Sequence, residues 1–500
     1  MKEISEGVLL TREEYQEMVS KASSLSKLEL DYLYLKNELE QLKRIIFGHK
    51  SERYVPANDG QLSLDFGQGL QSTQEPEPQT EEISYSRKKN KPVQQPVRHE
   101  LPANLPRIEI TIEPETDLTG AKRIGEVVTE ILEYNPGKLF VKKYIRPKYA
   151  MPREEGIKIA PMPVLPVEKS NAGPGLLAHI AVSKFVDHLP FYRQAQIFKR
   201  QGIELSESTL NGWFSSTCRL IDSLNDASRV EIQKSPYLMA DETPIPVQTQ
   251  DKPGATHKGY FWAYYSPVSK IVYFDYQKGR GREGPETFLK NYAGTIQTDG
   301  YAAYNIFETR PGITLLACMA HARRKFEHAL DNDRARAAYA LKQFHTLYEI
   351  ERQCREGGYT HEQRFEIRQK EALPVMQGME AWLKKEITHT LPKSSIGEAM
   401  AYTLSLWQRL KRYLDNGMYE IDNNLIENTI RPIAIGRKNY LFAGSHEGAQ
   451  RAALIYSFFG TCKQNGVDPY AWLSDVLDRI PSHKANRLSE LLPHNWKKNQ

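Results

Sequence analysis

The chain of 500 residues is poor in cysteine, with only four, widely separated and without any C-x-x-C pair. A disulfide scaffold and a four-thiolate zinc site are therefore not expected. No apolar run approaches the roughly 18 to 20 residues that a membrane span needs. The first residues, MKEISEGVLLTREEYQ, are without the apolar core of a signal peptide. These absences predict a soluble protein of a reducing compartment.

The composition indicates a folded protein with several domains. Hydrophobic residues make up 40% of the chain and aromatic residues 10%, which is enough to build buried cores. Five hundred residues are too many for one hydrophobic core. The formal net charge of +5 permits a nucleic-acid partner without arguing strongly for one.

The N-terminal part predicts a helix that associates with another chain. Apolar side chains recur at steps of four and three, the pattern of a coiled-coil seam. They are Leu28, Tyr32, Leu35, Leu39, Leu42 and Ile46. A single amphipathic helix has the same pattern, but a polar linker follows it rather than more core. We assign residues 1–54 to a leucine-zipper-like coiled coil and residues 55–104, rich in Pro, Gln, Ser and Glu, to the linker.

Residues 105–170 hold short β-rich patches, and residues 171–232 read as a helical region. In the helical region, FYRQAQIFKR, a short turn and SESTLNGWFSST fit helix-turn-helix spacing, although an ordinary helical hairpin fits equally well. Ser206 is a good N-cap for the second helix, and Trp213 is expected in its core.

Residues 233–326 predict a mixed α/β sheet. YLMADETPIPV, GYFWAYYSP and KIVYFDYQKG are three successive strand-like runs, and helix and strand alternate after them. Residues 327–410 look like a helical insertion. The core then resumes over residues 411–465, and residues 466–500 form a C-terminal segment.

Three carboxylates stand out by context. Asp241 ends the strand-like run YLMAD, Asp299 ends TIQTD, and Glu427 lies at the head of a helix. Asn424 followed by Glu427 also fits a capping box, with Asn424 as the N-cap. Three carboxylates are easy to find by chance among 62 acidic residues, but acids rarely follow buried strands by accident. Such a trio suits two Mg²⁺ ions in phosphodiester cleavage.

Several long motifs resemble the insertion-sequence-66 family of bacterial transposases. They are MADETPIPV, QTDGYAAYN, CMAHARRKF and DNNLIENTIRPIAIGRKNYLFAGSHEGA, in the order of that family. The resemblance implies a multidomain α+β protein whose RNase-H-like core follows the coiled coil, the β module and a helical DNA-binding region. It implies that Asp241, Asp299 and Glu427 are the catalytic triad, holding two Mg²⁺ ions with Mn²⁺ as a substitute.

The same resemblance implies cleavage at transposon ends followed by transfer of the freed 3′ end to target DNA. A homo-oligomer, small accessory proteins of the same element and a place in the bacterial cytoplasm, at the nucleoid, are expected with it. The family commonly carries two Cys pairs in a zinc finger. Met151 and Glu154 stand where the second pair would be, so we predict no zinc here.

Six cations are weaker candidates for contacts with DNA phosphates. They are Arg323, Arg324, Lys325, Arg431, Arg437 and Lys438. Cys318 and His321 have C-x-x-H spacing but too few companions for a zinc site, and a structural role is expected for them. Two other functions stay open from sequence: an RNase-H-like nuclease without strand transfer, and an inactive DNA-binding regulator.

Overall fold

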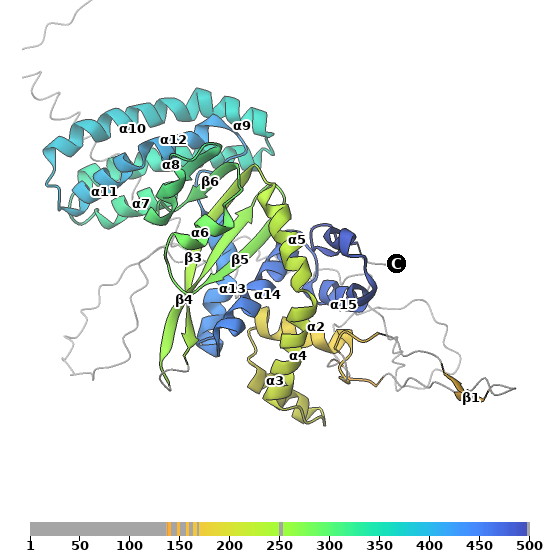
Figure 1. Cartoon of the computed structure of the whole chain (residues 1–500). Helices are drawn as coiled ribbons and strands as arrows, with labels where there is room; N and C mark the ends of the chain where they lie inside the picture. Colours follow the sequence, from red (N-terminus) through yellow and green to blue (C-terminus); the bar gives the residue numbers. More distant parts are fainter. Residues whose placement is uncertain are drawn as a thin grey trace, which may run out of the picture. The chain divides into compact units, whose positions relative to one another are not determined.

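The computed structural model describes residues 137, 139–141, 148–150, 157–159, 164–167, 170–249 and 254–497. The expected coiled coil and linker lie outside these residues, as do Met151 and Glu154. The chain divides into two compact units, and most described residues belong to the larger one (Figure 1). The smaller unit contributes an antiparallel hairpin of β1 (Lys148–Ala150) and β2 (Ile157–Ile159).

A five-stranded mixed sheet lies at the centre of the larger unit, as the strand-like runs predicted. In chain order its strands are β3 (Tyr237–Gln248), β4 (Thr256–Ser266), β5 (Ile271–Gln277), β6 (Gly294–Thr298) and β7 (Ile313–Ala317). The spatial order is β5-β4-β3-β6-β7. The first three strands form an antiparallel meander, and β6 and β7 continue the sheet parallel to β3.

Strand β3 separates two hydrophobic cores because its side chains alternate between the faces of the sheet. Tyr237 and Met239 pack into one core with α13 (Asn424–Tyr440), α14 (His446–Gln464) and other helices. Leu238 and Ala240 pack into the other core. The odd-numbered positions of β3 therefore face α13.

Helix α14 covers the edge strand β5 and bonds to its backbone. The amide of Phe274 donates to Ser457 Oγ at 2.7 Å, and the amide of Val272 donates to Thr461 Oγ1 at 3.0 Å. An exposed edge strand is a template for aggregation, and this helix blocks it. Figure 1 shows α14 beside the sheet, together with α5.

Further helices complete this part of the fold. They are α2 (Pro174–Phe185), α3 (Phe191–Arg200), α4 (Glu207–Leu220), α5 (Asp222–Gln233), α6 (Glu283–Phe288) and α15 (Pro469–Arg479), with short 3-10 turns at Ala302–Phe307, Ile480–Ser482 and Ala485–Leu491. The predicted N-cap is confirmed, because Ser206 Oγ accepts the Thr209 amide at 3.1 Å. Trp213 packs, half-buried, against the core.

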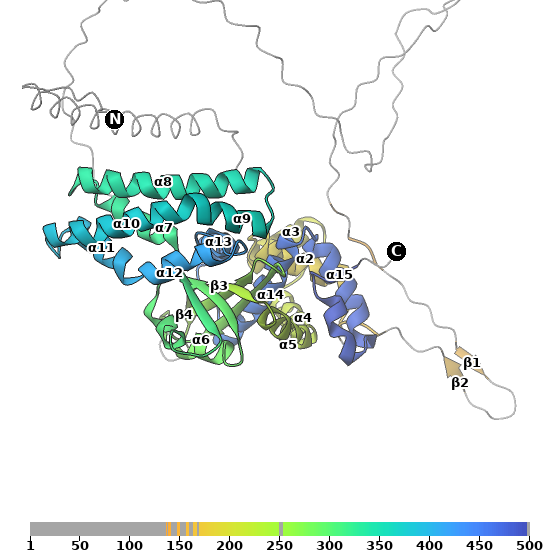
Figure 2. The same cartoon turned by 90° about the horizontal axis from the view of Figure 1, so that it is seen from above.

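A helical layer follows β7 and has a core of its own. It comprises α7 (Met319–His328), α8 (Arg334–Glu356), α9 (His361–Ile367), a π-turn (Arg368–Ala372), α10 (Leu373–Glu386), α11 (Ser395–Ser405) and α12 (Trp407–Lys411), with 3-10 turns at Ile387–His389 and Arg412–Asp415. Figure 2 shows α8, α10 and α11 side by side. Among the described helices, none has the length and apolar character to cross a membrane.

Candidate active site

The register of the sheet brings Asp241 and Asp299 together. Strands β3 and β6 are parallel, with Tyr237 opposite Thr295 and Met239 opposite Gln297. That offset equals the spacing of the two acids, since 295 − 237 = 58 and 299 − 241 = 58. Asp299, directly after the end of β6, therefore lies level with Asp241 on the neighbouring strand, and adjacent strands are about 4.8 Å apart.

Helix α13 carries Glu427 to the same place. Its start is anchored by Asn423, which is fully buried: Nδ2 donates to the Ala240 carbonyl at 3.1 Å, and the amide donates to Cys318 Sγ at 3.2 Å. The carbonyl of Ala240 immediately precedes Asp241. One asparagine thus ties the start of α13 to the strand that bears Asp241.

The capping box predicted for Asn424 is wrong. The N-cap of α13 is Asn423, and no side chain caps the helix. Asn424 is the first helical residue, and its Nδ2 donates to Asp422 Oδ2 at 2.8 Å. The Asn423 side chain donates through Nδ2 to β3, and its Oδ1, the atom that would accept a helix amide, is buried without a partner. Because the N-cap is Asn423, Glu427 lies one position deeper in the helix than a capping box requires.

A cavity of about 340 Å³ opens between these elements. Its lining residues come from β3, α7 and α13: Asp241, Glu242, Thr243, His321, Arg324, Glu427, Ile430, Arg431 and Ala434. Two predicted acids and two predicted cations meet here. Asp299 is not among the lining residues, although its charge acts on Asp241.

The electrostatics of the cavity favour a cation. Burial raises the pKa of Asp241 well above its ordinary value, and the negative charges of Glu242, Asp299 and Glu427 raise it further. The Glu242 amide donates to Asp241 Oδ1 at 2.8 Å and opposes this shift. Because several carboxylates repel one another at one place, a bound cation would relieve the repulsion.

The donor chemistry fits Mg²⁺, which binds carboxylate oxygens. Glu242 Oε2 is buried and has no hydrogen-bond partner, so an unused oxygen is also at hand. In the described part of the chain, however, no three His, Cys, Asp or Glu side chains are grouped closely enough to hold a metal ion. Binding an ion at these residues therefore requires the side chains to move closer together.

Helices of the inserted layer fix the backbone at Asp299. Its carbonyl accepts a hydrogen bond from the Tyr402 hydroxyl of α11 at 2.8 Å, and its Oδ1 accepts the Tyr301 amide at 2.8 Å. Gly300 has a φ of +93°, and a Cβ there would lie 2.7 Å from Leu406 Cδ1. Only glycine fits this turn, because Leu406 of the helical layer packs directly against it.

Two further residues belong to this site: Glu242, which the sequence did not single out, and His321, for which a structural role was expected. Glu242, with a side chain 3% exposed, pairs with Arg280, whose Nε donates to Oε1 at 2.8 Å. His321 lines the cavity, and its Nδ1 is buried without a partner. One signal was available for each: Glu242 adjoins Asp241, and His321 lies in the first turn of a helix that follows a parallel strand.

The six candidate DNA contacts divide by position. Arg324 and Arg431 line the cavity. Arg323 pairs with Glu327 at 3.1 Å, and the Lys325 Nζ lies 5.5 Å from the centre of the Tyr402 ring.

The remaining cations lie near the end of α13. Arg437 donates to the Pro244 carbonyl, and burial lowers its pKa, whereas Lys438 is exposed. Cys318 is buried and its Sγ accepts a backbone amide, the structural role expected of it. Burial raises the pKa of its thiol.

Comparisons with known proteins identify the family. Residues 169–451 match the description "Transposase IS66 family", residues 457–494 match "IS66 C-terminal element", and residues 34–110 match "Transposase C of IS166 homeodomain". The chain is 35% identical to the uncharacterized protein y4jD of Sinorhizobium fredii, over 97% of this chain and 98% of that protein. It is 34% identical to y4hP of the same organism, over 93% and 89% of the two chains. The chain therefore belongs to the IS66 family of transposases.

Proposed function

We propose that this protein cleaves DNA at the ends of a bacterial insertion sequence and joins the freed 3′ ends to target DNA. The observation that carries the proposal is the register of β3 and β6, which aligns Asp241 with Asp299 beside the helix of Glu427. Strands β5, β4 and β3 form an antiparallel meander, and β6 and β7 continue the sheet parallel to β3. Asp241 lies within β3 and Asp299 directly after β6, and this arrangement supports an RNase-H-like core.

In this proposal Asp241, Asp299 and Glu427 hold two Mg²⁺ ions, with Mn²⁺ as a substitute. Such ions, when bound, activate the attacking hydroxyl and stabilise the leaving 3′ oxygen. Arg324 and Arg431, which line the same cavity, bind phosphates of the DNA strand. Asn423 and Tyr402 hold the helix start and the Asp299 turn in position. No covalent link between protein and DNA is needed.

The test is incubation of the purified full chain with transposon-end DNA and a target plasmid in Mg²⁺ or Mn²⁺. We expect Asp241→Asn, Asp299→Asn and Glu427→Gln each to lower end cleavage by at least about 100-fold, because metal ions supply several kcal/mol of charge stabilisation. Glu362→Gln, at an exposed position of α9, is the matched control and should keep full activity.

Each other outcome has a definite reading. Full activity of Glu427→Gln would show that the site is assigned wrongly. Cleavage of the ends would identify a nuclease if strand transfer is absent, including strand transfer from DNA that already carries a free 3′ end. Absence of both reactions in the wild type, also with the accessory proteins of the element present, would indicate an inactive DNA-binding relative.

A further inference from the structure

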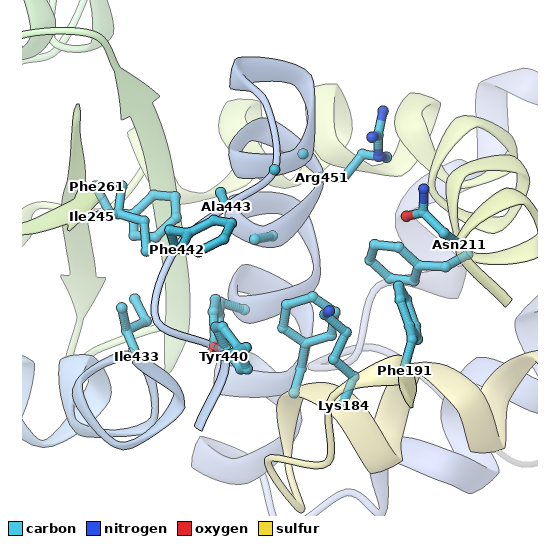
Figure 3. A pocket seen from close by; sticks show the side chains of 16 residues that line it. Lys184, Phe191, Asn211, Ile245, Phe261, Ile433, Tyr440, Phe442, Ala443 and Arg451 are labelled. Carbon is cyan, nitrogen blue, oxygen red and sulfur yellow. The ribbon is translucent and has the colours of Figure 1, made fainter. Parts of the chain in front are cut away.

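A second cavity, of about 100 Å³, lies apart from the carboxylates and shares no lining residue with their cavity. Helices α2, α3 and α4, strands β3 and β4, and the α13–α14 loop enclose it (Figure 3). Seven aromatic rings line it: Phe185, Phe191, Phe214, Phe261, Tyr440, Phe442 and Tyr456. We call this cavity the aromatic pocket. Its volume admits several waters or one small planar group.

Two cationic side chains, those of Lys184 and Arg451, line the aromatic pocket. Lys184 Nζ lies 3.9 Å from the centre of the Phe191 ring and 5.3 Å from that of Tyr440. Within the described residues Lys184 forms no ion pair, and no acid lines the pocket. Arg451 Nε is buried without a hydrogen-bond partner. A buried donor that lacks a partner is costly, so a ligand with acceptor atoms or negative charge would suit Arg451 Nε and the half-buried Lys184 ammonium of the same pocket.

The loop at the mouth of the pocket is strained and exposes apolar side chains. Leu441 has a φ of +58°, a conformation that costs a branched residue on the order of 1 kcal/mol or more. Its side chain is 64% exposed, and that of Phe442 is 41% exposed. The loop does not relax because Ala443 pairs with β3: its amide donates to the Pro246 carbonyl at 2.9 Å.

Helix α13 connects this loop with the carboxylate cavity. Glu427 lies near its start and Tyr440 at its end, a separation of 440 − 427 = 13 residues. At 1.5 Å per residue this is about 20 Å along the helix. A duplex lying along α13 from the carboxylates would cover this distance in about six base steps.

We propose that the aromatic pocket receives a nucleotide unstacked from the bound DNA, while Leu441 enters the duplex as a wedge. The base stacks on the aromatic rings, and Lys184 and Arg451 donate hydrogen bonds to its acceptor atoms or phosphate. Apolar wedges of this kind unstack base steps in other DNA-binding proteins. The inference rests on the proposed action on DNA and adds a second binding site to it.

The test measures binding of the full chain to two 40-base-pair duplexes in EDTA. One duplex carries a single extrahelical 2-aminopurine, and the other is fully paired. We expect the wild type to prefer the first by about tenfold, because stacking of one base contributes about 1 to 3 kcal/mol. Lys184→Met and Phe442→Ala should reduce the preference to about twofold or less while binding the paired duplex as the wild type does.

Matched controls are Lys199→Met, on the exposed side of α3, and Ile435→Ala, an apolar residue 45% exposed on α13. Both should keep the preference. Thermal unfolding of each variant shows that it is folded. Equal affinity of the wild type for the two duplexes, or an unchanged preference in Lys184→Met, overturns the inference.

The two proposals fail in different ways. The binding assay contains no metal, so Asp241→Asn should retain the preference for the extrahelical base. Metal-dependent end cleavage combined with equal binding of both duplexes would refute the aromatic pocket alone. A clear preference for the extrahelical base without any cleavage would refute the catalytic assignment alone.

Discussion

Lys184 shows how one side chain can be placed at a cost to stability. It projects from α2 among aromatic rings, and no acid lines its pocket. Burial lowers its pKa from 10.5 to about 8. Contacts with ring faces stabilise a cation, but here they do not offset the loss of water. A lysine at this cost to stability is better explained by binding than by packing.

The lowered pKa predicts a pH dependence of stability. Between pH 8 and 10.5 the unfolded chain holds the Lys184 proton while the folded chain has released it, so the free energy of unfolding rises with pH in that window. Lys184→Met should remove this rise and increase the free energy of unfolding at pH 7 by about 1 to 3 kcal/mol. Urea unfolding at pH 7, 8.5 and 10 measures both effects, with Lys199→Met as the control. A less stable Lys184→Met with an unchanged slope would contradict the argument.

At the scale of elements, a buried ion network ties the helical layer to the segment that leads into α13. Arg368, fully buried, donates to Glu351 Oε1 at 2.7 Å and to the carbonyls of Tyr413, Asn416 and Tyr419 at 2.8 Å each. The three bonds to carbonyls fix the segment that leads into α13, the helix of Glu427. The helical layer therefore supports the site although it interrupts the core in sequence.

Removing one partner of this network should be strongly destabilising. Glu351→Gln keeps the side-chain shape but leaves the buried Arg368 without a carboxylate partner and Arg364 with Glu420 alone, and we expect a loss of about 3 to 5 kcal/mol. The matched control is Glu349→Gln, two positions earlier on α8, where an exposed pair with Arg352 contributes less than about 1 kcal/mol. Urea unfolding compares the two variants. Similar small losses in both would show that the buried network does not stabilise the fold.

At the scale of the whole molecule, the acids come from segments that precede and follow the helical layer in the sequence. Asp241 lies in β3, Asp299 directly after β6, and Glu427 in α13. Without a cation these acids repel one another, so Asp241→Asn should raise the melting temperature in EDTA. Adding Mg²⁺ should raise the melting temperature of the wild type. At about 100 times the dissociation constant, the ion adds about 2.7 kcal/mol to the free energy of unfolding. Thermal unfolding with and without Mg²⁺ measures the difference, and Glu362→Gln is the control. Equal Mg²⁺ shifts in wild type and Asp241→Asn would place the ion elsewhere.

Local patterns in the sequence predicted much of the sheet. The runs around Asp241 and Asp299 are strands in the structure, and the N-cap at Ser206 is where the pattern placed it. These features depend on neighbouring residues, which is why periodicity and capping chemistry detect them. The family follows from long motifs for the same reason, and the comparisons confirm it.

The sequence by itself determined the strands, the acid that follows β6 and the family, whereas Asp241, predicted to end a strand, lies within β3. Only the tertiary structure decided which residues meet. Asn423, not Asn424, starts α13 because its side chain bonds to β3, far away in sequence. Lys184 and Tyr440 line one pocket although they are 440 − 184 = 256 positions apart in the sequence. Register and packing are set by contacts between distant segments, and no local pattern records them.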